Sequence, residues 1–323
     1  MTNLQAGLHA GPRLPFAQLY APGKIVTNEG GFPMRVHKAT PYLMILAACT
    51  LLFLFRVYPL LYTVCESFQA EGKPSLSVYQ KLANDVIFWR SMGVTLKLNI
   101  VIIPVQLVLS LALALLVNNQ IRGIGVFRTL FFLPFTISSA VACVLWSLLL
   151  SQNNGLVNSV LNSLGIASQG FWGDKDQALW CVVAEASWVG CGYWMVFFLA
   201  GLKGIDRQVY ESAQIDGAGY FRTLISITIP LLKRVTLFVM VANTTSNLLL
   251  FTPMKIITNG GPMGSTNTLM FEAYKSAFKY GNQSRSAAIV TVLLALVGAV
   301  CALQFYLMRD RDDKPSAKEA ISL

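Results

Sequence analysis

Charged residues are scarce in this sequence. Only 12% of its 323 residues are Asp, Glu, Lys or Arg, whereas soluble domains carry about 25%. So few charges do not cover a water-facing surface, and the hydrophobic residues, 54% of the chain, gather in long runs instead of short periodic stretches. This composition excludes an ordinary soluble protein and predicts a chain that folds mainly in lipid.

Residues typical of catalytic and metal sites are also scarce. The two histidines lie in the first forty residues, and no CxxC pair occurs among the six cysteines, which lie in or beside apolar stretches and are interpreted as small hydrophobic residues. No GxxxxGK[ST] phosphate loop occurs, so the chain does not cradle ATP by that route. We therefore expect no catalytic residue, no metal site and no cofactor in this chain, and predict that it is not an enzyme.

Six stretches are long and apolar enough to cross a bilayer as helices, which takes about twenty residues each. They predict an all-α, polytopic membrane protein with six transmembrane helices. We expect residues 1–40 to form a cytoplasmic tail, 41–308 the transmembrane domain and 309–323 a second cytoplasmic tail. The predicted spans are Tyr42–Tyr62, Val94–Val117, Thr129–Leu150, Ala178–Leu202, Val235–Met254 and Ala287–Met308.

The positive charges predict the orientation. If both termini are cytoplasmic, the inside segments hold 15 of the 25 Lys and Arg residues and the outside loops hold 8. The net charge of +10 is thereby explained by topology, so lipid is expected as a partner and nucleic acid is not. The N-terminal forty residues lack a leading apolar core, so we expect no cleaved signal peptide, and the first span directs the chain to the membrane.

The connection between the fourth and fifth spans, residues 203–234, is unusually long and predicts two short helices. Asp206 is a candidate N-cap, and Gly217 is expected to end the first helix, because glycine readily adopts the left-handed conformation. Val209, Ala213 and Ile215 are expected to line one face of that helix.

On the second helix, we expect an amphipathic face formed by Phe221, Leu224, Ile225 and Thr228, with Pro230 at the return to the membrane. Such a segment either docks into a groove on a partner or lies on lipid headgroups, and periodicity alone does not choose between them.

The residues of this loop resemble a known motif. Glu211-Ser-Ala, three residues, Gly217, nine residues and then Ile227-Thr-Ile-Pro230 is similar to the EAA loop of binding-protein-dependent ABC importer permeases. Ser212 and Ile229 depart from the usual alanine and leucine. Leu133-Pro134-Phe135 and Thr258-Asn-Gly-Gly-Pro262 resemble segments of the carbohydrate permeases, so the likeness covers most of residues 41–308 and indicates the maltose and glycerol-phosphate subgroup.

The resemblance implies a type I importer permease fold and a set of partners. These are a cytoplasmic ATPase pair that binds ATP and Mg, a second permease subunit, and an external solute-binding protein that delivers a small solute. The solute is expected to be a sugar, a polyol or a glycerol-phosphate-like molecule, moved across the bacterial cytoplasmic (inner) membrane. The residues that the resemblance assigns to ATPase docking are Tyr210, Glu211, Ser212, Ala213, Asp216, Gly217 and Ala218.

Polar residues within spans are candidates for a solute path, because lipid does not satisfy them. Asn243 and Asn247 are four residues apart in the fifth span and share a helix face, and the resemblance adds Gly190 and Tyr193 of the fourth span. The alternative is hydrogen bonding between helices or to the partner permease. Gln106 is interpreted as a packing contact.

Two charged residues in the spans, Arg56 and Glu185, leave three roles open: they pair, they gate, or they meet an anionic solute. The alternative function, an ion-coupled secondary transporter, would favour an internal repeat and paired carboxylates within the membrane. The spans carry one clear carboxylate, Glu185, and no repeat is visible.

Overall fold

The computed structural model describes residues 40–70, 73–118 and 123–308. The two predicted cytoplasmic tails lie outside these residues, except for Thr40. The chain divides into two compact units, one ending at Pro59 and one beginning at Leu60.

The described part of the first unit is a helix. α1 (Thr40–Leu52) continues through a π-helical turn, η2 (Phe53–Val57), into α2 (Tyr58–Ser67), which crosses into the second unit. The wide turn ends two residues before Pro59, which lacks an N–H and whose ring crowds the carbonyl four residues earlier. The same pattern recurs at Pro230, which follows the π-helical turn η4 (Leu224–Thr228).

The second unit is helical apart from a two-stranded hairpin. In this hairpin β1 pairs antiparallel with β2, Gln69 opposite Pro74 and Ala70 opposite Lys73. The elements of the unit after α2 are, in order, β1 (Gln69–Ala70), β2 (Lys73–Pro74), α3 (Ser77–Ala83), α4 (Val86–Asn118), α5 (Ile124–Thr136), α6 (Ser139–Leu149), α7 (Leu156–Ser163), η3 (Phe171–Gly173), α8 (Ala178–Lys203), α9 (Arg207–Ile215), α10 (Tyr220–Thr223), η4, α11 (Ile229–Leu231), α12 (Lys233–Leu248), η5 (Met254–Thr258), α13 (Leu269–Tyr274), η6 (Lys275–Lys279) and α14 (Gln283–Met308).

Four described helices are long and apolar enough to cross a membrane unbroken: Tyr42–Ser67, Val86–Asn118, Ala178–Lys203 and Gln283–Met308. Two further pairs qualify only as bent spans. α5 and α6 meet at 97°, and the helical run Tyr220–Leu231 meets α12 at 68°. If each bent pair crosses once, the described chain has six spans, the number that the sequence predicts.

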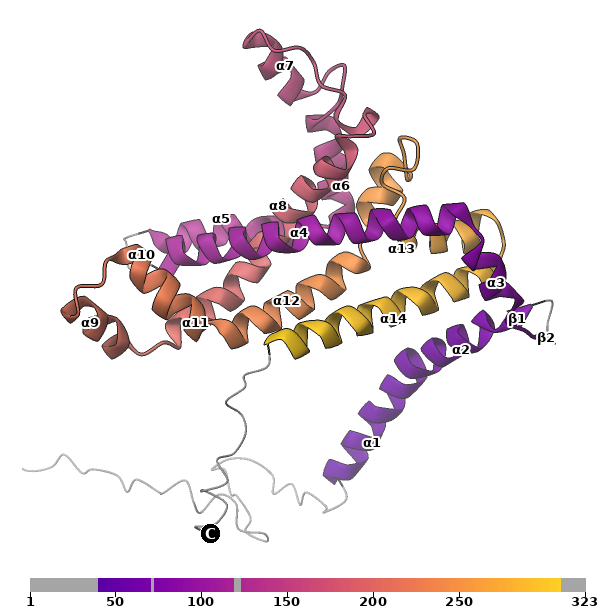
Figure 1. Ribbon diagram of the computed structural model, residues 1–323, viewed down its shortest axis with the longest axis horizontal. Helices are drawn as coiled ribbons and strands as arrows, with labels where there is room; N and C mark the ends of the chain where they lie inside the picture. The colour runs from indigo at the N-terminus through magenta and orange to yellow at the C-terminus, as the bar shows by residue number, and fades with distance from the viewer. Residues whose placement is uncertain (1–39, 71–72, 119–122, 309–323) are drawn as a thin grey trace, which may run out of the picture. The chain divides into compact units, whose positions relative to one another are not determined.

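The third predicted span, Thr129–Leu150, is wrong as a continuous helix. α5 ends at Thr136, and Ile137 and Ser138 adopt ψ values of 142° and 132°, which carry the chain out of the helix before α6 begins. The break follows closely on Pro134, whose missing N–H already weakens the last turn of α5. Figure 1 shows the chain turning out of the direction of α5 here, so that α6 packs against α8 and η5 and α7 projects from the bundle.

The fifth predicted span, Val235–Met254, ends too late. α12 stops at Leu248, and the amides of Leu249 and Leu250 turn back to bond the Thr245 and Asn247 carbonyls. Pro253 follows shortly after this end and does not continue a helical hydrogen-bond ladder. Met254 therefore belongs to the separate π-helical turn η5 beyond the fifth helix.

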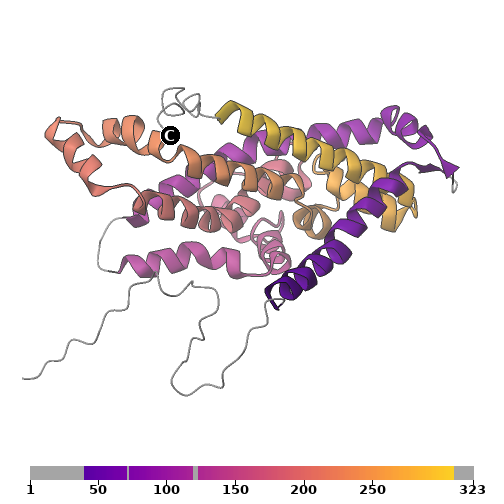
Figure 2. The same cartoon turned by 90° about the horizontal axis from the view of Figure 1, so that it is seen from below.

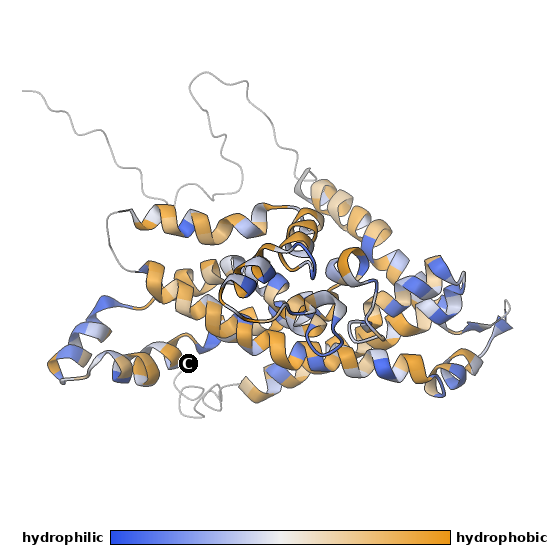
Figure 3. Ribbon diagram, turned by 90° about the horizontal axis from the view of Figure 1, so that it is seen from above, coloured by the Kyte–Doolittle hydropathy of each residue, from blue (hydrophilic) through white to orange (hydrophobic). Residues whose placement is uncertain are grey.

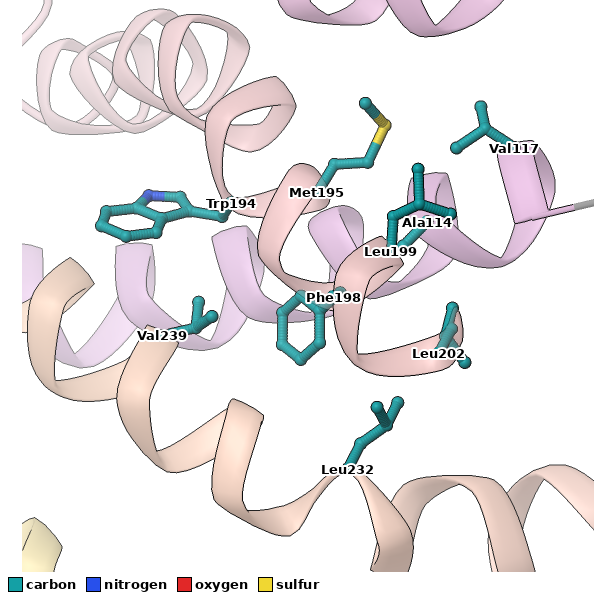
Figure 4. Packing of buried hydrophobic residues seen from close by; sticks show 9 residues of the cluster. All are labelled: Ala114, Val117, Trp194, Met195, Phe198, Leu199, Leu202, Leu232 and Val239. Atoms are coloured by element: carbon teal, nitrogen blue, oxygen red, sulfur yellow. The ribbon is translucent and has the colours of Figure 1, made fainter. Parts of the chain in front are cut away.

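The core of the unit lies where α8 packs along α4, α5 and α12. In Figure 4, Leu232 and Val239 lie beside α8, facing Phe198 and Leu202. Figure 2 shows these helices running alongside one another, and in Figure 3 they are mostly apolar along their length. The buried members of this cluster are Ala114, Val117, Trp194, Met195, Phe198, Leu199, Leu202, Leu232 and Val239.

A network of charges joins three segments at the end of the bundle where α14 begins. Arg285 bonds Asp85 just before α4, with Nη2 to Oδ2 at 2.7 Å, and Glu272 of α13, with Nη1 to Oε1 at 2.9 Å. The other Glu272 oxygen is 2.8 Å from Lys275 Nζ and accepts a hydrogen bond from Asn267 at 2.9 Å. Glu272 is only 1% exposed, and burial alone would raise its pKa. The hydrogen bonds from Lys275, Asn267 and Arg285 outweigh that effect and hold the pKa of Glu272 below its ordinary value.

Candidate functional site

The coupling loop is the connection between the fourth and fifth spans, residues 203–234, which the resemblance assigns to ATPase docking. It lies at the opposite end of the bundle from α3 and the hairpin. It runs from the end of α8 through α9, α10, η4 and α11 to α12, and Figure 1 shows it projecting beyond the ends of the long helices. The two predicted short helices are both present in this loop.

α9 begins as the sequence predicts. The side chain of Asp206 accepts a hydrogen bond from the Gln208 amide at 3.0 Å, as an N-cap does. Further along this helix, Glu211 pairs with Arg207 at 2.9 Å, and both side chains are largely exposed. Such a surface pair contributes little stability, so Glu211 stays accessible to a partner. Ser212 donates to the Gln208 carbonyl at 2.9 Å and is engaged within the helix.

α9 ends in a Schellman motif centred on Gly217. The Ala218 amide donates to the Ala213 carbonyl at 2.9 Å, and the Gly217 amide donates to the Gln214 carbonyl at 3.1 Å. Gly217 has φ +71°, the left-handed conformation that a side chain disfavours, and a Cβ placed there would meet nothing within 4 Å. Asp216 is the C-cap residue that precedes it. Backbone conformation, not crowding within this chain, therefore requires glycine at 217.

The loop presents apolar side chains to its surroundings. Ile215 is 86% exposed and Phe221 is 74% exposed, and Tyr220 and Ile225 are also exposed. The prediction that Ile215 shares a face with Ala213 is wrong. Ala213 is only 5% exposed, and residues two positions apart lie on different sides of a helix. An exposed apolar patch rimmed by polar residues is typical of an interaction surface.

The two helices of the loop touch each other. Thr228 Oγ1 lies 3.4 Å from the Tyr210 hydroxyl and also donates to the Thr223 carbonyl at 3.3 Å. Tyr210 therefore links α9 to the segment that enters α12.

The second candidate site is a cavity of about 340 Å³ between the helices. Three of the four predicted path residues line it: Gly190 and Tyr193 on α8, and Asn247 on α12. Asn243 is fully buried and does not reach the cavity. The lining residues are Gln106, Phe135, Ser139, Glu185, Ala186, Val189, Gly190, Tyr193, Trp194, Ser246, Asn247 and Leu250.

A cluster of amides joins α4 to α12 beside the cavity. Gln106 Oε1 accepts from Asn243 Nδ2 at 2.6 Å and from Asn247 Nδ2 at 2.9 Å, and Asn247 Nδ2 also lies 2.8 Å from Asn243 Oδ1. Gln106 in turn donates to the Ala186 carbonyl of α8 at 3.0 Å. The alternative interpretation of the two asparagines, hydrogen bonding between helices, is therefore confirmed, and Asn247 lines the cavity as well.

Aromatic rings and one carboxylate complete the cavity. The rings of Phe135 and Tyr193 stack with centroids 4.3 Å apart, and Trp194 packs edge-on to Tyr193 at 4.8 Å. Glu185, buried on α8, accepts a hydrogen bond from the Cys143 thiol at 3.6 Å. Arg56 belongs to the other unit, and pairing, gating and contact with an anionic solute all stay open as roles for Arg56 and Glu185.

Gln106 lines the cavity, but the sequence did not predict it as a site residue. There it was interpreted as a packing contact only. The available signal was a primary amide inside an apolar span, where an unsatisfied polar group is costly. Gly190 is close to Gln106: a Cβ at 190 would lie 3.2 Å from Gln106 Nε2 and 3.6 Å from Trp194 Nε1. The small residue at 190 thus leaves room for the amide cluster and the cavity.

Membrane-spanning helices with a projecting loop and a cavity between them are typical of transport proteins. The chain is a member of the family described as "binding-protein-dependent transport system inner membrane component", whose model matches residues 100–312. It is therefore a multi-pass inner-membrane component of an ABC importer, with the type I permease fold, and not an enzyme. The ion-coupled alternative finds no support in this membership.

Individual relatives agree. The chain is 32% identical to the lactose transport system permease protein LacF of Rhizobium radiobacter, over 86% of this chain and 96% of LacF. It is 34% identical to the sn-glycerol-3-phosphate transport system permease protein UgpA of Yersinia enterocolitica, over 82% and 92% of the two chains. A chain of a bacterial alginate ABC transporter, solved in complex with its alginate pentasaccharide-bound periplasmic protein, matches in fold with a TM-score of 0.75. That match has 19% identity and covers 83% and 93% of the two chains.

Proposed function

We propose that this chain is one permease subunit of an ATP-driven importer for a sugar, a polyol or a glycerol-phosphate-like solute. A separate ATPase pair binds ATP and Mg, a second permease chain completes the channel, and an external binding protein delivers the solute. Both termini face the cytoplasm of a bacterial cell. The printed substrates of the relatives, lactose and sn-glycerol 3-phosphate, support this class of solute.

The coupling loop carries the proposal. It combines a helix capped at Asp206, a left-handed glycine turn at 217 and an exposed apolar surface that includes Ile215 and Phe221. A helix-in-groove contact with an ATPase subunit uses these features, since the apolar side chains supply the buried surface and the turn fixes its shape. The docking residues Tyr210, Glu211, Ser212, Ala213, Asp216, Gly217 and Ala218 all lie in this loop.

The cavity supplies the solute path in this proposal. Gly190, Tyr193 and Asn247 line it, and Asn243 holds Asn247 in place from the buried side. Stacked aromatic rings and amides suit sugar hydroxyls and the apolar faces of sugar rings. At about 340 Å³, the cavity is near the lower end of the roughly 300–1,000 Å³ range of small-molecule sites.

Reconstitution tests the function. We expect proteoliposomes that contain this chain, its second permease and the ATPase to accumulate labelled solute only when ATP and the loaded binding protein are supplied. The control omits ATP and imposes a proton or sodium gradient. Uptake by the purified chain alone, driven by such a gradient, would refute the proposal.

Gly190→Leu tests the solute path separately. We expect it to lower ATP-driven uptake at least about tenfold, since the added side chain enters the cavity and presses on Gln106. The ATPase should still co-purify with the variant, because the coupling loop is untouched. Gly298→Leu is the matched control: it is also a helical glycine, exposed on α14, and a Cβ there meets nothing within 4 Å. Equal uptake by the two variants would show that the solute does not pass through this cavity.

A further inference from the structure

The charge of the cavity narrows the solute class. We infer that the transported solute is an uncharged sugar or polyol, and that Glu185 acts as a specificity residue that disfavours anionic solutes. This inference rests on the proposed function and concerns the same cavity. The inference distinguishes between two kinds of solute that occur in the names of the relatives. Lactose is neutral, whereas sn-glycerol 3-phosphate is an anion.

Glu185 is the acidic side chain of the cavity. It is 2% exposed, lies on α8 and lines the cavity five residues before Gly190. Its Oε1 accepts the weak hydrogen bond from Cys143, a neutral group. Among the described residues that line the cavity there is no lysine, arginine or histidine. Glu185 supplies no positive charge to an anion, and its ionised form repels one.

Asn247, Ser246 and Glu185 offer acceptors to the cavity, while Tyr193 and Trp194, which also line it, carry a hydroxyl and an indole N–H that can donate. Both amide hydrogens of Asn247 are directed to Gln106 and Asn243, which leaves its side-chain oxygen for a ligand. The Ser246 hydroxyl donates to the Ala242 carbonyl at 3.0 Å, so its free capacity is that of an acceptor. Together with the Glu185 oxygens, these groups suit a ligand rich in O–H donors.

A sugar meets these demands and an anion does not. Sugar hydroxyls donate to the carboxylate and to the two acceptors, and hydrogen bonds to an ionised group are the stronger ones. The apolar face of a sugar ring covers the stacked rings of Phe135 and Tyr193. The carboxylate or fully ionised phosphate group of an anionic solute brings no donor of its own, although the solute's hydroxyls can still donate. That group would also lie beside the ionised form of Glu185 and the negative faces of aromatic rings, at low dielectric.

The test measures solute binding to the permease complex without the external binding protein, so that the selectivity of that protein does not enter. The uncharged probes are lactose, maltose and glycerol; the anionic probes are galacturonate and sn-glycerol 3-phosphate, at constant ionic strength. We expect at least one uncharged probe to bind, and each anion to bind at least about tenfold more weakly than that probe.

Glu185→Gln keeps the shape and removes the charge. We expect this variant to reduce the ratio of neutral to anionic affinity at least about threefold, because the repulsion is lost. Ser246→Ala is the comparison: it removes a neutral acceptor and should weaken both classes of probe without changing their ratio by as much.

Three results overturn the inference: an anion that binds wild type as tightly as the uncharged probes, a ratio that Glu185→Gln leaves unchanged, or no uncharged probe that binds. ATP-driven uptake in the same preparations keeps the two proposals apart. If an anion binds and is accumulated with ATP, the importer function stands and the neutral-solute inference falls. If ATP drives no uptake of any solute delivered by the binding protein, the proposed function falls.

Discussion

Gly217→Val is expected to lower ATP-driven uptake at least about tenfold while the chain still inserts into the membrane. The left-handed conformation at φ +71° costs a non-glycine residue about 1–2 kcal/mol, and more for a β-branched side chain. The Schellman bonds from Ala218 and Gly217 then loosen, and the apolar surface around Ile215 and Phe221 loses its shape. The measurement is uptake in proteoliposomes, together with the amount of ATPase that co-purifies with the permease.

Two substitutions make this result specific. Gly281→Val is the matched control, since Gly281 has φ +64° and equally open space but lies between η6 and α14, away from the coupling loop. It should carry a similar backbone strain and keep the ATPase bound. Gly217→Asn should retain most of the uptake, because asparagine tolerates the left-handed region. Normal uptake by Gly217→Val, or the same loss for Gly281→Val, would contradict the docking role of the loop.

Arg285→Met is expected to give the largest loss of stability, about 3 kcal/mol. It leaves Glu272, 1% exposed, with Lys275 and Asn267 but without its arginine, and it removes the link from α14 to Asp85. A buried carboxylate that loses a charged partner keeps its desolvation cost without the compensating attraction. The measurement is the midpoint of thermal unfolding of the purified complex in one detergent.

Arg207→Met is the control for this loss. Arg207 also pairs with a glutamate, at 2.9 Å, but both partners are largely exposed, so its removal should cost less than about 1 kcal/mol. The double variant Glu272→Gln with Arg285→Met should lose less than the sum of the two single variants, because the residues share one network. If Arg285→Met unfolds at the same temperature as Arg207→Met, the network does not hold these segments together.

The coupling loop could be predicted closely from sequence because its signals are local. The side chain of Asp206 caps its helix by accepting a hydrogen bond from a residue two positions away. The two hydrogen bonds that end the helix at Gly217 join residues three and five positions apart. Ile215 was misplaced because it was grouped with Ala213, two residues earlier, although residues that share a helix face are spaced three or four apart.

The helix breaks were harder to predict. Pro134 is visible in the sequence, yet the sequence predicted one span through Thr129–Leu150, where the structure has a 97° bend. Hydropathy measures the apolar length of a segment, and a bent pair is as apolar as a straight span. The early end of α12 at Leu248 is likewise hidden, because Leu249, Leu250 and Phe251 continue the apolar run.

The cavity required the tertiary structure. Gln106 is more than 130 residues from Asn243 along the chain, and only the packing of α4 against α12 brings their amides within 2.6 Å. Glu185 and Phe135 reach the same cavity from α8 and α5. Nothing in the local sequence of any one helix indicates which of its faces meets the others.

The insertion of this protein into lipid, its helical class and the coupling motif follow from local sequence, because apolar length, charge scarcity and helix-capping residues act over a few neighbouring positions. Three other features follow from the packing: where the third span bends, which polar residues surround one cavity, and that Glu185 faces it without a neighbouring cation among the described lining residues. These features depend on contacts between helices that are far apart in the chain, and such contacts follow from packing as a whole.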